Sequence, residues 1–175
     1  YVYYQQKDYL KAIANFNKII DQPNAVSQNA YYHLAESYIN LNKKPEALNA
    51  FKSASEMDFN KQIKEDAALN YAKLSYEEGN PYKSVPEVLQ DYLKAYPKSK
   101  HYNEVNQLLV TSYIHQQDYI GALTYLEKNK SVENKELIKE VSFYRGIQLF
   151  NENQLQKAYP FFAVATQSNV PNIKQ

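Results

Sequence analysis

One residue register repeats along the chain, and it constrains the fold more than any other sequence feature. Its reference position is mostly a small residue, and successive copies stand 35, 38, 37 and 36 residues apart: Ala12, Ala47, Val85, Ala122 and Ala158. Four residues later a large apolar residue follows: Phe16, Phe51, Leu89, Leu126 and Phe162. Nine residues before the reference position stands another large apolar residue: Tyr3, Tyr38, Tyr76, Tyr113 and Leu149. A period of this length predicts repeated helix pairs, each burying its apolar face against the next pair.

Apolar residues within one copy follow helical spacing. Between Asn29 and Leu41 they recur three and four residues apart and form one stripe: Ala30, Tyr31, Leu34, Ala35 and Tyr38. Short segments that favour turns follow the helices, such as residues 42–45 and 116–118, and connections this short make neighbouring helices antiparallel. The chain has only 3 glycines and 7 prolines, too few turn formers for a sheet with many hairpins. The pattern therefore predicts an all-α fold.

These residues resemble the tetratricopeptide repeat, whose first helix carries a large residue, Leu-Gly and Tyr, and whose second carries Ala, Phe and Pro. Gly146 matches the glycine of that pattern, Ala35 takes its place in another copy, and Tyr31 and Leu69 replace its tryptophan. The resemblance implies a right-handed α-solenoid of antiparallel helix pairs with about ten helices, the first truncated. We expect one array, excised from a longer protein, with a half-repeat and four repeats at residues 1–26, 28–61, 66–99, 103–136 and 139–172.

A second resemblance rests on residues 89–99, which are similar to repeats of bacterial cell-envelope proteins in outer-membrane assembly and Tol–Pal systems. The chain also opens on Tyr1 rather than on methionine, which is consistent with a targeting signal upstream. This resemblance favours a bacterial origin and a periplasmic or cell-envelope location over a cytoplasmic one.

Charge and composition exclude several classes of function. With 20 basic and 19 acidic residues the net charge is +1, so no overall field attracts nucleic acid or an anionic membrane. The longest apolar run, residues 161–165, is far shorter than the roughly 20 residues that span a bilayer, which disfavours direct membrane insertion. Cysteine is absent, which removes disulfides and cysteine metal sites.

The sequence favours no catalytic site, cofactor or metal. The three histidines, His33, His101 and His115, lie on different segments without metal-ligand spacing, and no glycine-rich phosphate loop is present. The tyrosines that stand in register are interpreted as core residues. Catalysis stays a third hypothesis, and it would require His33 or His115.

First-helix residues that lie off the apolar stripe are predicted to line a concave groove, which is the candidate binding site. The predicted ligand-binding residues are Tyr32, His33, Glu36, Asn70, Tyr71, Leu74, Leu108, Thr111, His115, Phe143, Tyr144 and Ile147. None is Lys or Arg, which disfavours RNA binding and capture of a peptide's terminal carboxylate. Most of the lysines are instead predicted on second helices and loops, which leaves the groove acidic and aromatic.

The resemblance implies a non-catalytic protein–protein interaction scaffold, and the groove chemistry predicts a neutral or basic protein or peptide partner with apolar anchors. The alternative is a bacterial cell-surface component that handles carbohydrate by stacking sugars on groove aromatics. The groove could also bind nothing, or pack on another part of the same protein. At the C-terminal end, Phe161, Phe162 and Val164 predict an apolar patch and end-to-end self-association of the fragment.

Overall fold

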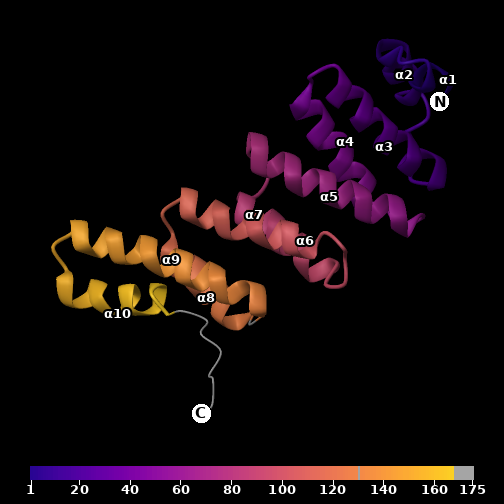
Figure 1. Ribbon diagram of the computed structural model, residues 1–175. Helices are drawn as coiled ribbons and strands as arrows, with labels where there is room; N and C mark the ends of the chain where they lie inside the picture. The colour runs from indigo at the N-terminus through magenta and orange to yellow at the C-terminus, as the bar shows by residue number, and fades with distance from the viewer. Residues whose placement is uncertain (130, 168–175) are drawn as a thin grey trace. The chain divides into compact units, whose positions relative to one another are not determined.

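The computed structural model describes residues 1–129 and 131–167 (Figure 1). These residues form ten α-helices and no β-strand, which confirms the all-α prediction. The helices are α1 (Val2–Gln5), α2 (Tyr9–Phe16), α3 (Ala25–Asn40), α4 (Lys44–Glu56), α5 (Lys61–Glu78), α6 (Val85–Ala95), α7 (Tyr102–His115), α8 (Tyr119–Lys128), α9 (Val132–Asn151) and α10 (Leu155–Ala165). The boundary predicted for the last repeat, residue 172, lies outside the described residues.

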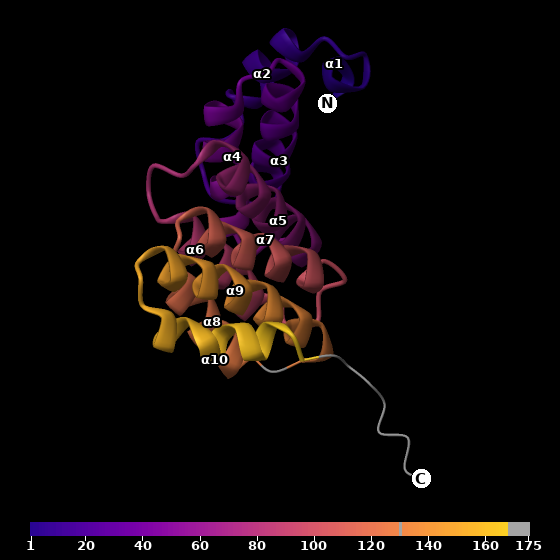
Figure 2. The same ribbon diagram turned by 60° about the vertical axis from the view of Figure 1, so that its left-hand side comes forward.

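Two compact units make up the chain, the first ending at Leu109 and the second beginning at Val110, within α7. In the first unit each helix from α1 to α6 packs on the next, and α3 also contacts α5. In the second unit α8 packs on α9 and α9 on α10. Figures 1 and 2 show α3, α4 and α5 side by side, and α9 beside α10. This consecutive packing of helix pairs is the arrangement that the tetratricopeptide-like register predicts.

The repeated register marks the core of the first unit. Ala12 and Ala47 are buried, as are Phe16 and Phe51 four residues later. A small side chain on one helix lets a neighbouring helix approach closely, and the ring fills the remaining volume. Val85 departs from this pattern, because it is the first residue of α6 and is only half-buried.

A glycine allows close helix contact in the second unit. Ala122, Leu126 and Ala158 are buried here, as the register predicts. A Cβ atom added at Gly146 of α9 would lie 2.7 Å from a ring atom of Phe162 on α10, so even an alanine would force the Phe162 ring or its helix to shift. Phe162 itself is only partly buried.

Four helix-pair turns share one backbone conformation. The residue five before the reference position has a positive φ in each: Lys7 (60°), Asn42 (56°), Gln117 (56°) and Asn153 (59°). The backbone amide of the residue that follows donates to the carbonyl of the residue nine before the reference position. For example, the Asp118 amide donates to the Tyr113 carbonyl over 2.9 Å. This is the Schellman pattern of helix ends, which glycine suits best because a side chain there is strained.

We expect glycine at position 117 to stabilise the protein. The left-handed conformation costs a residue with a side chain about 1 kcal/mol, and glycine avoids this cost. Glycine also gives the unfolded chain more conformational freedom, which offsets part of the gain, so Gln117→Gly should raise the free energy of unfolding by about 0.5 kcal/mol. Gln116→Gly is the matched control, since Gln116 lacks the positive φ, and it should destabilise. Urea denaturation of both variants checks this, and equal effects would contradict the assignment of the turn.

Candidate functional site

A hollow of about 390 Å³ in the first unit lies where the sequence predicts part of the groove. It is called the α3–α5 hollow here. Its lining residues come from α1, α3, α4 and α5: Tyr4, Tyr32, Glu36, Ile39, Asn40, Phe51, Asn70, Lys73, Leu74 and Glu77. Aromatic rings and aliphatic side chains alternate in it with carboxylates and amides. Such a surface favours an extended ligand that has both apolar and hydrogen-bonding groups.

Glu36 of α3 is the best-connected carboxylate of the hollow. The Tyr4 hydroxyl donates to its Oε2 over 2.8 Å, and Nδ1 of His33 lies 2.7 Å from the same oxygen. Burial, and then the bond to the Glu36 carboxylate, raises the pKa of the Tyr4 hydroxyl well above its usual range. The tyrosine therefore stays a donor throughout the physiological range, which holds α1 against α3.

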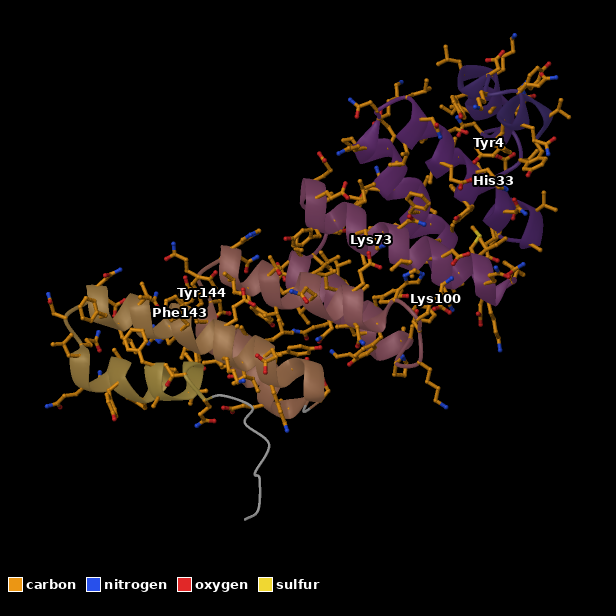
Figure 3. The ribbon with its side chains drawn as sticks, in the orientation of Figure 1. Tyr4, His33, Lys73, Lys100, Phe143 and Tyr144 are labelled. Carbon is orange, nitrogen blue, oxygen red and sulfur yellow. The ribbon has the colours of Figure 1, made fainter. Side chains whose placement is uncertain are left out.

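His33 lies among aromatic rings beside the hollow (Figure 3). Its ring centroid is 4.9 Å from that of Tyr4, 5.1 Å from Tyr1, 5.6 Å from Tyr32 and 6.1 Å from Phe16. It lines a neighbouring hollow with Tyr1 and Phe16 rather than the α3–α5 hollow. Its role in this structure is therefore to join α1, α2 and α3.

A lysine lies in the hollow, contrary to the prediction that the inner face carries none. Lys73 of α5 lines the hollow, and its Nζ atom is 2.5 Å from a carboxylate oxygen of Glu104 on α7. The bond from Lys73 lowers the pKa of Glu104, so this carboxylate is ionised at neutral pH. Glu104 balances Lys73, and Lys44 lies 3.8 Å from Glu77 but is shared with Glu78 at 2.5 Å, so the carboxylates of Glu36 and Glu77 still give the hollow a weakly acidic character.

The structure brings together four of the predicted site residues in this hollow: Tyr32, Glu36, Asn70 and Leu74. Leu74 is almost fully buried and forms part of the floor. Tyr71 does not join them, because it lines a different hollow between α4 and α6. Sequence reasoning missed Tyr4, Phe51 and Lys73. Tyr4 stands beside the in-register Tyr3, which is the one signal that could have identified it.

The other predicted site residues lie on α7 and α9. Leu108 is half-buried in the first unit, and Thr111 and His115 lie on the part of α7 in the second unit. On α9, Phe143, Tyr144 and Ile147 are exposed, and the Tyr144 ring stacks on that of Tyr119 with centroids 6.1 Å apart. Figure 3 shows Phe143 and Tyr144 on α9. The second unit thus presents an apolar helix face.

Residues 29–56, which cover most of α3 and all of α4, match the model of the tetratricopeptide repeat family. These residues are similar to a tetratricopeptide repeat. This repeat supplies Tyr32, Glu36 and Phe51 to the α3–α5 hollow, so the matched segment and the candidate site overlap. A comparison with curated proteins found no match.

Nowhere in residues 1–129 and 131–167 do three or more metal-ligating His, Cys, Asp or Glu side chains converge. No helix in the same ranges is both long and apolar enough to cross a membrane.

Proposed function

We propose that this chain is a non-catalytic scaffold that holds a polypeptide segment in the α3–α5 hollow. Tetratricopeptide repeats bind protein partners, and the matched repeat provides one wall of the hollow. The observation that carries the proposal is the hollow itself, since its rings and carboxylates come from several helices and are held by the core. A preformed surface of this kind binds a segment without the cost of ordering its own loops.

The chemistry of the hollow defines the partner. Glu36 and Glu77 attract a neutral or basic segment, and the rings of Tyr32 and Phe51 suit apolar side chains on it. Opposite charge should act mainly on the association rate, and salt should weaken binding modestly because Glu77 is exposed to solvent. Most of the binding energy should come from the aromatic contacts.

Selection of linear peptides from a random phage-displayed library against the immobilised chain tests the proposal. The enriched peptides should combine lysine or arginine with aromatic or branched apolar residues. Tyr32→Ala and Ile39→Ala should each weaken a selected peptide about tenfold, because both side chains line the hollow. Ile39 is 41% exposed, so its variant keeps the fold, and Tyr159→Ala on α10 serves as a control that should not change affinity.

Two results would contradict the proposal. One is enrichment of acidic peptides whose affinity is unchanged by Tyr32→Ala and Ile39→Ala. The other is binding on a glycan array in the absence of any peptide binding, which would favour the carbohydrate-handling alternative.

A further inference from the structure

Helix α10 presents an apolar face to solvent. Tyr159 is 75% exposed, more than any other large apolar side chain among the described residues, and Leu155 one turn earlier is exposed as well. Residues four apart lie on the same side of a helix, so these two side chains form one surface, called the α10 face here. The sequence predicts the apolar patch of this helix from Phe161, Phe162 and Val164 instead, and those three side chains are partly buried.

Tyr159 occupies a register position that the fold covers in the other copies. It follows the reference residue by one, and its counterparts are Ile13, Leu48, Pro86 and Leu123. Leu48 and Pro86 are buried, and Ile13 and Leu123 are partly buried against the cores of their units. Helix α4, which carries Leu48, packs on α3 before it and on α5 after it, whereas α10 packs on α9. This position is therefore one where a further helix packs.

A hollow of about 490 Å³ between α2 and α3, called the α2–α3 hollow here, is a matching apolar surface in the first unit. Its apolar lining comes from Phe16, Ile19, Ala25, Val26 and Ala30. Phe16 and Ala30 are buried, whereas Ile19 and Val26 are exposed, so the hollow is open to solvent. Covering such a surface with an apolar side chain is favourable, because it removes both partners from water.

Two polar groups also line this hollow, the Asn29 amide and the His33 ring. Nδ1 of His33 lies 2.7 Å from the Glu36 carboxylate, whereas its Nε2 and the Asn29 amide bond to no other group in the described part of the chain. A tyrosine combines an apolar ring with a hydroxyl that both donates and accepts. The lining therefore suits a tyrosine such as Tyr159 better than a wholly aliphatic side chain.

The charges beside the two surfaces do not oppose a contact between them. Lys18 and Asp21 flank the hollow next to Ile19, and Glu152 and Lys157 flank the α10 face; all four are exposed. None of these four forms an ion pair within residues 1–129 and 131–167. Each surface thus carries one lysine and one carboxylate, so a contact brings both signs together without net repulsion.

We propose that the α2–α3 hollow is a docking site for a second copy of this chain, which inserts Leu155 and Tyr159 of its α10 face. The contact joins two different surfaces, so every assembly keeps one free hollow and one free α10 face, and association continues beyond the dimer. None of the residues that line the α2–α3 hollow lines the α3–α5 hollow, so this contact does not depend on the peptide site proposed there.

Sedimentation equilibrium of the full chain from roughly 10 µM to roughly 1 mM tests the contact, a range that suits a small interface. The weight-average mass of the wild type should rise with concentration and pass twice the mass of one chain. Tyr159→Glu alters the α10 face and Val26→Glu alters the hollow, and each should weaken association at least about tenfold. Val26 is 63% exposed in the first turn of α3, where a carboxylate is favourable, so this variant keeps the fold.

An equimolar mixture of the two variants is the decisive sample. Val26→Glu keeps an intact α10 face and Tyr159→Glu keeps an intact hollow, so the mixture should form dimers and no larger assembly, although neither variant associates alone. Phe59→Glu and Phe150→Glu are matched controls, because both side chains are exposed and line neither surface, and they should associate as the wild type does. Ile39→Ala, which weakens the peptide site, should also associate normally.

Four results would overturn the proposal: a wild type that stays monomeric at roughly 1 mM, a single variant that associates as strongly as the wild type, a mixture that forms no dimer, or a loss of association in Phe150→Glu. The last of these would place the contact on α9. Because the peptide site is measured separately with Ile39→Ala, its failure is distinguishable from failure of this contact.

Discussion

Phe51→Ala should lower the free energy of unfolding by about 3–5 kcal/mol, the largest effect that we expect from a single core residue. The Phe51 ring is 3% exposed and packs edge-on against Tyr32, with ring centroids 5.8 Å apart. Removing it leaves a cavity between α3, α4 and α5 that the surrounding helices cannot fill. Guanidinium denaturation followed by far-ultraviolet circular dichroism measures the loss.

Two other phenylalanines calibrate this result. Phe59 is 53% exposed, so Phe59→Ala should change stability by less than about 0.5 kcal/mol. Phe162 stands in register with Phe51 but is only partly buried, so Phe162→Ala should cost clearly less than Phe51→Ala. Equal losses for Phe51 and Phe59 would contradict the core assignment and the register on which it rests.

Gln28→Ala should destabilise by about 3 kcal/mol, although the residue is polar. The Gln28 side chain is completely buried, and its Oε1 accepts from the Asn60 amide over 2.7 Å. Its Nε2 donates to the carbonyls of Met57 over 2.8 Å, Ala54 over 3.1 Å and Asn60 over 3.3 Å. One side chain thus satisfies the backbone of the α4–α5 connection, and its loss leaves several buried groups without partners.

The control for Gln28 is a glutamine on the surface of the same unit. Gln62 is exposed in the first turn of α5, so Gln62→Ala should leave the denaturation midpoint almost unchanged. Gln28→Glu adds a second comparison, because an ionised carboxylate cannot donate to the three carbonyls and should cost at least as much as alanine. Wild-type stability of Gln28→Ala would show that the hydrogen bonds contribute nothing net.

Periodicity predicts the features that every repeat needs. Ala47 with Phe51, and Ala122 with Leu126, are recognisable because a helix pair packs only when a small and a large residue alternate at fixed spacing. The all-α fold follows from the same pattern. Gln28 was not predictable as a core residue, because its burial depends on backbone groups about 30 residues away that only the folded chain brings close.

The candidate site was predictable in part. Tyr32 and Asn70 lie in the α3–α5 hollow, whereas His33 and Tyr71, one residue later, line other hollows. One residue turns the side chain by about 100° around the helix axis, so adjacent residues of one helix face different hollows, which a projection from sequence alone does not separate. Lys73 was missed because its place depends on Glu104, which lies 31 positions further along the chain on another helix.

The most direct test of the scaffold proposal is to map a bound peptide on the chain. A basic, aromatic peptide selected from the library is titrated into the ¹⁵N-labelled protein, and amide shift changes are assigned along the sequence. The largest changes should fall on residues 32–40 of α3 and on residues 70–77 of α5, which line the α3–α5 hollow. Changes confined to the lysine-bearing second helices, or to the exposed face of α9, would show that the polypeptide binds elsewhere.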